Sequence, residues 1–329
     1  MAQTAKDFLE SAMRKLQSRD LAGAFADFDQ AIALDPDFAD AYIQRGIARD
    51  DNGDRDGAIV EYNKAIAIAP GSPEAYRNRG IAKRGKGDFA GAIADHDKAI
   101  ALRPDYTAAF IARGLAKQDR RDFDGAVADY SMAISLDPEF PGIHRRRGEI
   151  RMDQGDLDGA ISDYDQAIAR QPDEGDDYLI RSTAHCLKGN FERELADLEK
   201  VMAIHKSAKY RNMARFRRLL GLRRLHREEN RDAFAEEVGA WPEGWPKVVG
   251  EFLGGGLPEE KFLARAEKAA GQTPSEQRCE AFYYAGMMRL LAADRSGARA
   301  LFEKCLATNE HYSLEFGLAQ AELIRLPSG

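Results

Sequence analysis

The sequence predicts an all-α protein built as a solenoid of helical repeats. Prolines recur 34 residues apart, at Pro36, Pro70, Pro104, Pro138 and Pro172, and such a period marks a repeat architecture. A chain of 329 residues exceeds the usual size of one core, so an extended array accounts for its length. The 44% hydrophobic and 31% charged residues suit an apolar core with a charged surface.

Each repeat is predicted to form two antiparallel helices. A proline opens the first helix region, a glycine such as Gly53 closes it, and Asp54, Asp88 or Asp156 caps the second helix. Gly46 and its equivalents are expected to let the two helices approach closely. Large residues fill one column and are expected to pack the space between repeats: Phe28, Tyr62, His96, Tyr130 and Tyr164.

The stretch DAYIQRGIARDDNGDRDGAIVEYNKAIAIAP (residues 40–70) resembles the tetratricopeptide repeat (TPR) motif in its glycine, alanine, aromatic and proline columns. The resemblance covers residues 4–206, so we assign six repeats to a domain over residues 1–206. The sixth repeat is degenerate, with Ser182 and Glu194 at positions where small residues are expected. The resemblance implies a right-handed α-α superhelix, a TPR solenoid, whose first helices line a concave groove that binds peptides or partner proteins.

Residues 207–329 are predicted to be a C-terminal helical extension. A degenerate repeat is expected at about 214–247, with Gly221 and Ala233, and a better one at about 279–312, with Gly286, Ala298 and Phe302. The amphipathic segment over about 313–326 is expected to form a helix that caps the apolar end of the stack.

Residues 207–326 are also similar to the NlpI-type bacterial envelope TPR lipoproteins, in a tryptophan before an EFLGG stretch, a helix, and a late repeat followed by a Glu-Leu-rich helix. The resemblance implies a dimeric adaptor that regulates a protease or cell-wall hydrolases. No lipid-bearing cysteine lies near residue 1, and no apolar run reaches the ~18 residues of a membrane span. A cytoplasmic location is expected for the chain as given, and a periplasmic one if a signal peptide was removed.

Arginine recurs every 34 residues where the family usually has leucine, and an acidic column shares the period. We interpret these columns as a structural ladder of ion pairs that fixes the register of adjacent repeats, rather than as an anion site. Ser11 leaves Asp27 without an arginine in its own repeat, so pairing is predicted between neighbours: Asp27 with Arg45, and Glu61 with Arg79. The ladder comprises Asp27, Arg45, Glu61, Arg79, Asp95, Arg113, Asp129, Arg147, Asp163 and Arg181, with Asp197 in the sixth repeat.

Residues that vary between repeats on the groove side of the first helices are the candidates for partner recognition, by resemblance to the family. They form a mixed apolar and basic set suited to an extended or helical peptide. The set is Ile43, Ile47, Asp50, Arg77, Asn78, Ile81, Arg84, Ile111, Leu115, Gln118, Arg145, Arg146, Glu149 and Met152.

The segment 206–231 holds ten Lys or Arg residues against Glu228 and Glu229, in a chain of net charge -7. An anionic polymer or lipid surface is one interpretation. A solvated helix face with acidic neighbours is the other, and we favour it because no aromatic residues interleave to stack bases. The overall acidic charge disfavours nucleic acid as a partner.

No constellation of residues indicates catalysis, a metal or a cofactor. The stretch NGDRDG at Asn52–Gly57 has Asn63 where a calcium loop needs glutamate, and the sequence lacks nucleophile-elbow and zinc-hydrolase motifs. His96 is predicted to be a core filler. Cys186, Cys279 and Cys305 are expected as free buried thiols, with a Cys279–Cys305 disulfide as the alternative.

We therefore expect a non-catalytic scaffold or adaptor for protein or peptide partners. The NlpI-like envelope adaptor and the anionic-polymer binder are the alternatives. Homodimerisation stays open.

Overall fold

The computed structural model describes residues 3–140, 142–227, 230–267, 274–311 and 313–327. Within these ranges the chain forms 19 α-helices and no strand, which confirms the predicted all-α solenoid class. The chain divides into two compact units, Met1–Asp156 and Leu157–Gly329. The division expected at residue 206 concerns the regularity of the repeats and stays a prediction.

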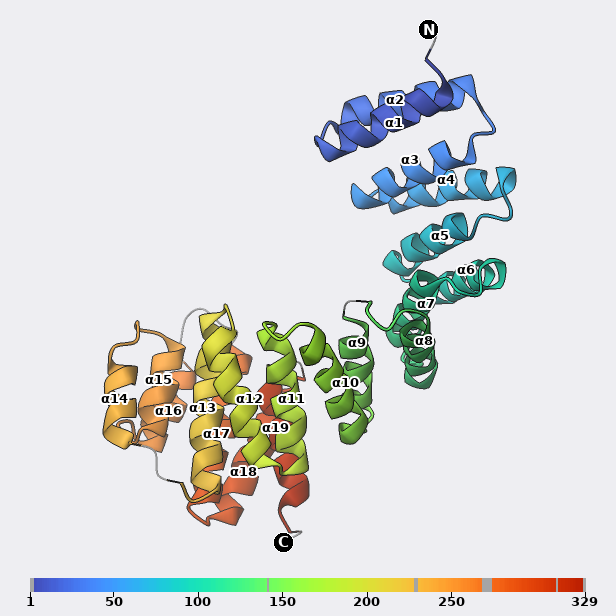
Figure 1. Ribbon diagram of the computed structural model, residues 1–329. Coiled ribbons are helices and arrows are strands. Elements are labelled where there is room, and N and C mark those ends of the chain that lie inside the picture. The colour runs from blue at the N-terminus through green and yellow to red at the C-terminus, as the bar shows by residue number, and fades with distance from the viewer. Residues whose placement is uncertain (1–2, 141, 228–229, 268–273, 312, 328–329) are drawn as a thin grey trace. The chain divides into compact units, whose positions relative to one another are not determined.

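The first compact unit stacks four complete repeats and the first helix of a fifth (Figure 1). Within each complete repeat the two helices pack against each other. Between repeats, α4 packs on α5 and α6 packs on α7. The helices are α1 (Ala5–Gln17), α2 (Leu21–Leu34), α3 (Ala39–Asp51), α4 (Arg55–Ile68), α5 (Pro73–Gly85), α6 (Phe89–Leu102), α7 (Thr107–Asp119), α8 (Phe123–Leu136) and α9 (Ile143–Asp153).

The second compact unit begins with three packed helices, α10 to α12, and ends in helices without the 34-residue period. Its final helix packs on the two helices before it, α17 and α18. The helices are α10 (Leu157–Arg170), α11 (Gly175–Lys188), α12 (Phe191–Ile204), α13 (Ala208–Arg224), α14 (Arg231–Gly239), α15 (Trp245–Leu253), α16 (Glu259–Ala266), α17 (Pro274–Leu291), α18 (Arg295–Leu306) and α19 (Leu314–Arg325).

Second helices begin with an aspartate three residues before a glycine. The Asp54 carboxylate accepts the backbone N–H of Gly57 at 2.9 Å, and a Cβ on Gly57 would lie 2.1 Å from that carboxylate. Asp88 caps α6 in the same way. The caps predicted at Asp54 and Asp88 are confirmed, and the glycine is needed because a side chain would displace the capping group.

A ring lies directly over a glycine inside the repeats. A Cβ on Gly46 would meet the Tyr62 ring at 2.6 Å, so α3 and α4 approach as closely as the sequence predicts. Tyr62 also belongs to a buried cluster with Ala75 and Ala82 of the next repeat. One aromatic side chain therefore fills both the interior of its own repeat and the junction with its neighbour.

The C-terminal helices share one apolar core that spans α11 to α19. Trp245 is buried, stacks on Phe262 with ring centroids 5.5 Å apart, and donates its indole N–H to Glu280 at 2.6 Å. Phe252 stacks on the same Phe262 ring. Trp245 therefore packs the irregular part of the chain.

Candidate functional site

Four of the ladder arginines, Arg45, Arg79, Arg113 and Arg181, pair with the acid of their own repeat. Arg79 donates two hydrogen bonds to the Asp95 carboxylate, at 2.9 and 2.5 Å, and Arg113 donates two to Asp129, at 3.0 and 2.6 Å. Arg45 meets Glu61 at 2.8 Å in the same geometry of first helix to second helix. The fork-shaped guanidinium suits this bidentate contact with a buried carboxylate.

The same arginines also reach back to the preceding repeat. A second guanidinium nitrogen donates to a polar side chain 16 residues earlier, on the second helix of the repeat before. The acceptors are Asp29 for Arg45 (2.5 Å), Asn63 for Arg79 (2.7 Å), Asp97 for Arg113 (2.6 Å), Ser131 for Arg147 (2.9 Å) and Asp165 for Arg181 (2.5 Å). Arg45, Arg79, Arg113 and Arg181 therefore each join three helices and two repeats.

The predicted pairing of Asp27 with Arg45 and of Glu61 with Arg79 is wrong. Asp27 pairs with Lys15 at 2.6 Å, and Glu61 takes Arg45. Within the antiparallel helix pair of one repeat, residues that are 16 apart in the sequence lie side by side. Sequence spacing alone does not show whether an arginine meets the acid of its own repeat or the acid of the repeat before it.

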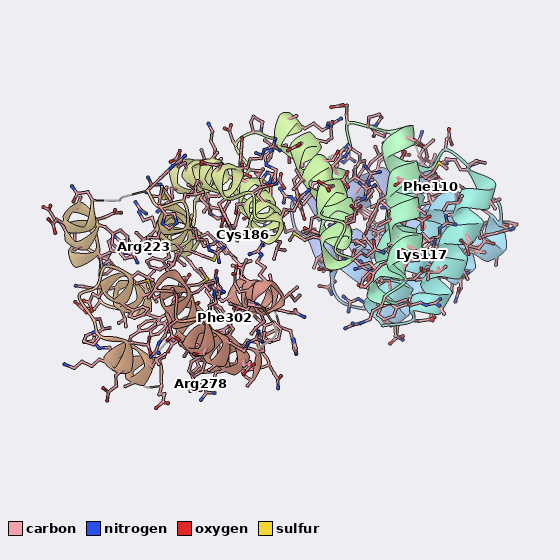
Figure 2. The ribbon with its side chains drawn as sticks, turned by 90° about the horizontal axis from the view of Figure 1, so that it is seen from below. Phe110, Lys117, Cys186, Arg223, Arg278 and Phe302 are labelled. Atoms are coloured by element: carbon pink, nitrogen blue, oxygen red, sulfur yellow. The ribbon has the colours of Figure 1, made fainter. Side chains whose placement is uncertain are left out.

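A second basic column, missed by the sequence analysis, serves the same acids. Its members lie 12 residues before each acid, one turn along the first helix from the ladder arginine. The pairs are Lys15–Asp27 (2.6 Å), Arg49–Glu61 (3.6 Å), Lys83–Asp95 (2.8 Å) and Lys117–Asp129 (2.8 Å). Its 34-residue period was visible in the sequence, and Figure 2 labels one member, Lys117, on α7.

The electrostatics of the ladder follow from these contacts. Burial raises the pKa of Asp27, but hydrogen bonds from Lys15 and Ser11 outweigh burial and leave that pKa below its ordinary value. The hydrogen bond with Asp95 raises the pKa of Arg79. The sixth-repeat pair of Arg181 and Asp197 keeps the geometry, at 2.6 Å, and Asp163 is buried on α10. The ladder is a set of charged groups that already satisfy one another.

The candidate groove residues all lie on the first helices α3, α5, α7 and α9. First helices of neighbouring repeats also touch, α3 with α5 and α5 with α7. The side chains are half-buried, except that Ile43 is buried and Arg146 is exposed. This surface presents apolar atoms and guanidinium groups together, and its residues differ from repeat to repeat, unlike those of the ladder.

Some of these side chains already form hydrogen bonds within the protein. Arg84 donates to Asp119 at 2.6 Å, from α5 to α7, and Gln118 accepts the Tyr130 hydroxyl at 3.1 Å. Arg77 donates to the neighbouring Asn78 at 3.1 Å. That the candidate groove residues bind a partner protein or peptide stays a prediction.

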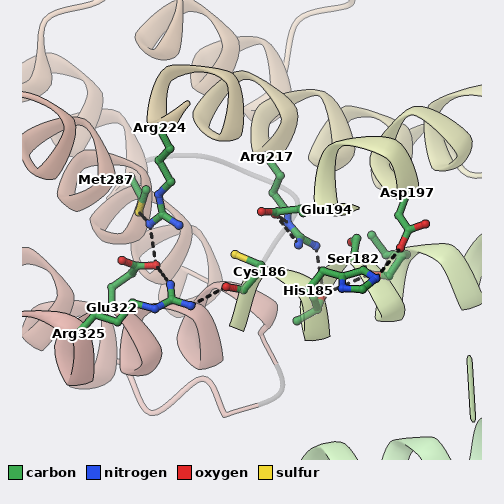
Figure 3. Close-up of polar contacts among 12 residues, drawn as sticks. Ser182, His185, Cys186, Glu194, Asp197, Arg217, Arg224, Met287, Glu322 and Arg325 are labelled. Atoms are coloured by element: carbon green, nitrogen blue, oxygen red, sulfur yellow. Dashed lines mark hydrogen bonds and ion pairs between the residues drawn. The ribbon is translucent and has the colours of Figure 1, made fainter. Parts of the chain in front are cut away.

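The basic segment is largely neutralised by acids from other helices. Arg217 is 3% exposed and meets Glu194 at 2.8 Å (Figure 3). Further pairs are Arg215–Glu237 (2.5 Å), Arg218–Glu199 (3.5 Å), Arg224–Glu322 (2.6 Å) and Arg227–Glu192 (2.6 Å). Glu228, Glu229 and the Arg231 side chain lie outside the described residues. The geometry favours the interpretation of a helix with acidic neighbours.

The three cysteines and His96 lie in the core. Cys186, Cys279 and Cys305 are free and buried, with the Sγ atoms of Cys279 and Cys305 3.1 Å apart. His96 is fully buried beneath Gly80, in the core position that the sequence predicts. Among the described residues, no three His, Cys, Asp or Glu side chains cluster as metal ligands, and no helix is long and apolar enough to cross a membrane.

Comparison with known proteins is consistent with this geometry. The family model of the tetratricopeptide repeat matches residues 9–73, 77–141, 111–176 and 145–205, more than half of the chain. No curated protein matches the sequence.

Two solved structures share the fold. The type IV pilus biogenesis factor PilW is 22% identical with a TM-score of 0.57, over 65% of this chain and 99% of its own. The Pseudomonas aeruginosa protein pilF is 16% identical with a TM-score of 0.55, over 64% of this chain and 96% of its own. At these identities the likeness concerns the fold alone. The resemblance of residues 207–326 to NlpI-type lipoproteins stays a prediction.

Proposed function

The chain belongs to the tetratricopeptide repeat family, and from that premise we propose that it is a non-catalytic scaffold that holds a segment of a protein partner against α3, α5, α7 and α9. Proteins of this family mediate protein–protein interactions and bind peptides. The observation that carries the proposal is the contrast between two sets of arginines. The ladder arginines are bound to buried acids in successive repeats, whereas the groove arginines vary and sit among half-buried aliphatic side chains.

The surface favours a partner segment with apolar anchors and acidic residues. Ile47, Ile81 and Leu115 offer apolar contact, since each is half-buried on a first helix. Arg77, Arg145 and Arg146 supply positive charge that orients an acidic segment. Binding of this kind gains affinity from apolar burial and direction from the charges.

The test is a comparative capture of partners by the full chain. The Arg77→Glu, Arg145→Glu double variant reverses two charges of the groove. A matched control, Lys64→Glu with Lys98→Glu, makes the same charge change at exposed positions of the second helices α4 and α6. We expect mass spectrometry to find partners that the wild type and the control retain and that the groove variant loses.

Titration calorimetry with the captured segment gives the size of the effect. We expect the groove variant to bind on the order of a hundredfold more weakly, because two favourable charge contacts become repulsive. Equal affinity of all three proteins would remove the groove from the proposal.

The anionic-polymer alternative has less support. Arg217 and Arg224 are committed to buried carboxylates, Glu194 and Glu322, at 2.8 and 2.6 Å. A binder of polyanions is expected to leave such charges available for phosphate contacts. Heparin affinity that fell steeply with salt, and fell further in a Lys206→Gln, Lys209→Gln variant, would restore this alternative.

A further inference from the structure

Two of the three cysteines lie side by side in the core of the second compact unit. Cys279 is on α17 and Cys305 is on α18, and both are fully buried in the same apolar cluster. Their Sγ atoms are 3.1 Å apart, which is about 1 Å more than the length of a disulfide bond. Neither thiol belongs to the candidate groove or to the ladder.

The packing of α17 against α18 fixes this contact. A Cβ on Gly286 would meet the Phe302 ring at 2.6 Å, the same approach of ring and glycine as in the regular repeats. Cys305 follows Phe302 by three residues, and it therefore stands where the regular repeats have a buried alanine. Those alanines are Ala31, Ala65, Ala99, Ala133 and Ala167. In this late pair of helices a sulfur atom occupies a core position that the other repeats leave to a methyl group.

The two thiols differ in how readily they ionise. The hydrogen bond from Cys305 lowers the pKa of Cys279, and the hydroxyls of Thr308 and Ser313 act in the same direction, against burial. The same contact and burial raise the pKa of Cys305. Because the thiolate is the nucleophilic form of cysteine, Cys279 is the thiol that reacts first and Cys305 is the one that reacts second.

We propose that Cys279 and Cys305 are an oxidation site, at which hydrogen peroxide converts the two thiols into a disulfide bond that ties α17 to α18. The Cys279 thiolate attacks a peroxide oxygen, the O–O bond breaks, hydroxide leaves, and Cys279 becomes a sulfenic acid. The Cys305 sulfur then attacks the Cys279 sulfur, the S–O bond breaks, and the sulfenic oxygen leaves as water with the proton of Cys305. The hydroxide takes up the proton that Cys279 released, so two thiols are oxidised and one peroxide is reduced to two waters.

Burial selects the oxidant and the cysteines that respond to it. Both sulfur atoms are fully buried, so an oxidant reaches them only when the helices open locally, and a small peroxide needs less opening than glutathione disulfide does. Cys186 is buried on α11, and burial raises its pKa to about 12. Little of its thiolate is present at neutral pH, so Cys186 is expected to remain reduced.

The experiment treats the reduced full-length protein with a small molar excess of hydrogen peroxide, unfolds it, and blocks the remaining thiols with N-ethylmaleimide. Mass spectrometry is expected to find one blocked thiol, Cys186, instead of three, and a pair of proteolytic peptides joined through Cys279 and Cys305. Dithiothreitol is expected to restore all three thiols. Three blocked thiols after peroxide treatment, or a loss that dithiothreitol does not reverse, would overturn the proposal.

Two alanine variants assign the roles of the thiols. Cys305→Ala installs the alanine of the regular repeats, and it is expected to leave Cys279 as a sulfenic acid that dimedone captures. Cys186→Ala is the matched control and is expected to form the cross-link as the wild type does. Both are expected to keep the helical circular dichroism of the wild type. A Cys279 that dimedone does not label in the first variant, or a missing cross-link in the second, would contradict these roles and the proposal with them.

Glutathione disulfide tests the choice of oxidant. It is expected to form the cross-link at least about tenfold more slowly than hydrogen peroxide at the same concentration, because both sulfur atoms are buried. Equal rates would overturn peroxide as the oxidant of this site.

Urea unfolding tests whether the bond ties the two helices in their native arrangement. A bond between residues 26 apart restricts the unfolded chain, so the oxidised wild type is expected to unfold at a higher urea concentration than the reduced protein. Peroxide treatment of Cys305→Ala is expected to bring no such gain. Unfolding of the oxidised wild type at the same or a lower urea concentration would show that the sulfur atoms leave their native positions to bond, which would overturn the proposal.

Discussion

At the scale of single residues, His96 is a core residue whose pKa differs between the folded and the unfolded protein. It fills the column that holds tyrosine in neighbouring repeats, it is fully buried, and neither ring nitrogen has a hydrogen-bond partner among the described residues. Burial, then the charge of Arg77, lowers the pKa of His96 from 6.5 to about 4, although Asp95 and Asp97 act in the other direction. The folded state therefore holds this imidazole neutral.

Acid is expected to destabilise the array through His96. The unfolded chain takes up a proton near pH 6.5 and the folded chain near pH 4, so stability is present above pH 6.5 and declines as the pH falls toward 4. The loss amounts to about 3 kcal/mol. Urea unfolding at pH 7.5 and pH 4.5 measures it.

The control for this prediction is His96→Tyr, which installs the residue found at Tyr62 and Tyr130. This variant is expected to lose clearly less stability over the same pH interval than the wild type. The same acid sensitivity in both proteins would assign the effect to other titrating groups.

At the scale of helices, the ladder determines how the two helices of a repeat and the preceding repeat are joined. Arg113 on α7 contacts Asp129 on α8 and Asp97 on α6. The Asp129 side chain is 4% exposed and the Asp97 side chain is 55% exposed. One arginine thus makes a buried pair within its repeat and an exposed pair with its neighbour, and these two pairs differ in energy.

The two acids of Arg113 are expected to differ sharply in their contribution to stability. Asp129→Asn leaves Arg113 and Lys117 without their buried counter-charge, and it is expected to cost about 3 kcal/mol. Asp97→Asn removes an exposed pair and is expected to cost less than about 1 kcal/mol. Chemical denaturation of both variants and the wild type measures the difference, and equal costs would contradict this account of the ladder.

The sequence could predict the elements that repeat. The 34-residue period predicted the helix pairs, the caps at Asp54 and Asp88, and the close approach at Gly46. It did not predict which acid each arginine meets, because Asp27 and Glu61 stand in equivalent columns and only the folded hairpin brings Arg45 to Glu61. The Lys15 column was visible but was not recognised.

At the scale of the whole molecule, the C-terminal helices are held by contacts distant in sequence. Glu322 on α19 pairs with Arg224 on α13, and Arg325 donates to the carbonyls of Cys186 and Leu187 on α11. No periodic column connects these segments, so the sequence could not predict these contacts. The candidate groove residues were predicted from family resemblance. That resemblance indicates which surface binds a partner but not which contacts each residue makes.

Removal of α19 is expected to affect the second compact unit alone. A chain that ends after residue 310 exposes the apolar faces of α17 and α18, and it leaves Arg224 without Glu322. Hydrogen exchange followed by mass spectrometry is expected to accelerate in α13, α17 and α18 and to stay unchanged in α1 to α8. Acceleration throughout the first unit would show that the two units do not unfold separately.

The ladder arginines that join neighbouring repeats also bear on how such a chain can evolve. The second to fifth repeats each carry an arginine that reaches back and, on the second helix, a polar acceptor for the arginine that follows, as Asp97 serves Arg113 and Asn63 serves Arg79. A duplication or loss of one 34-residue segment by recombination within the gene therefore leaves every new junction with both of its halves. The length of the array can change by whole repeats without the need for compensating mutations.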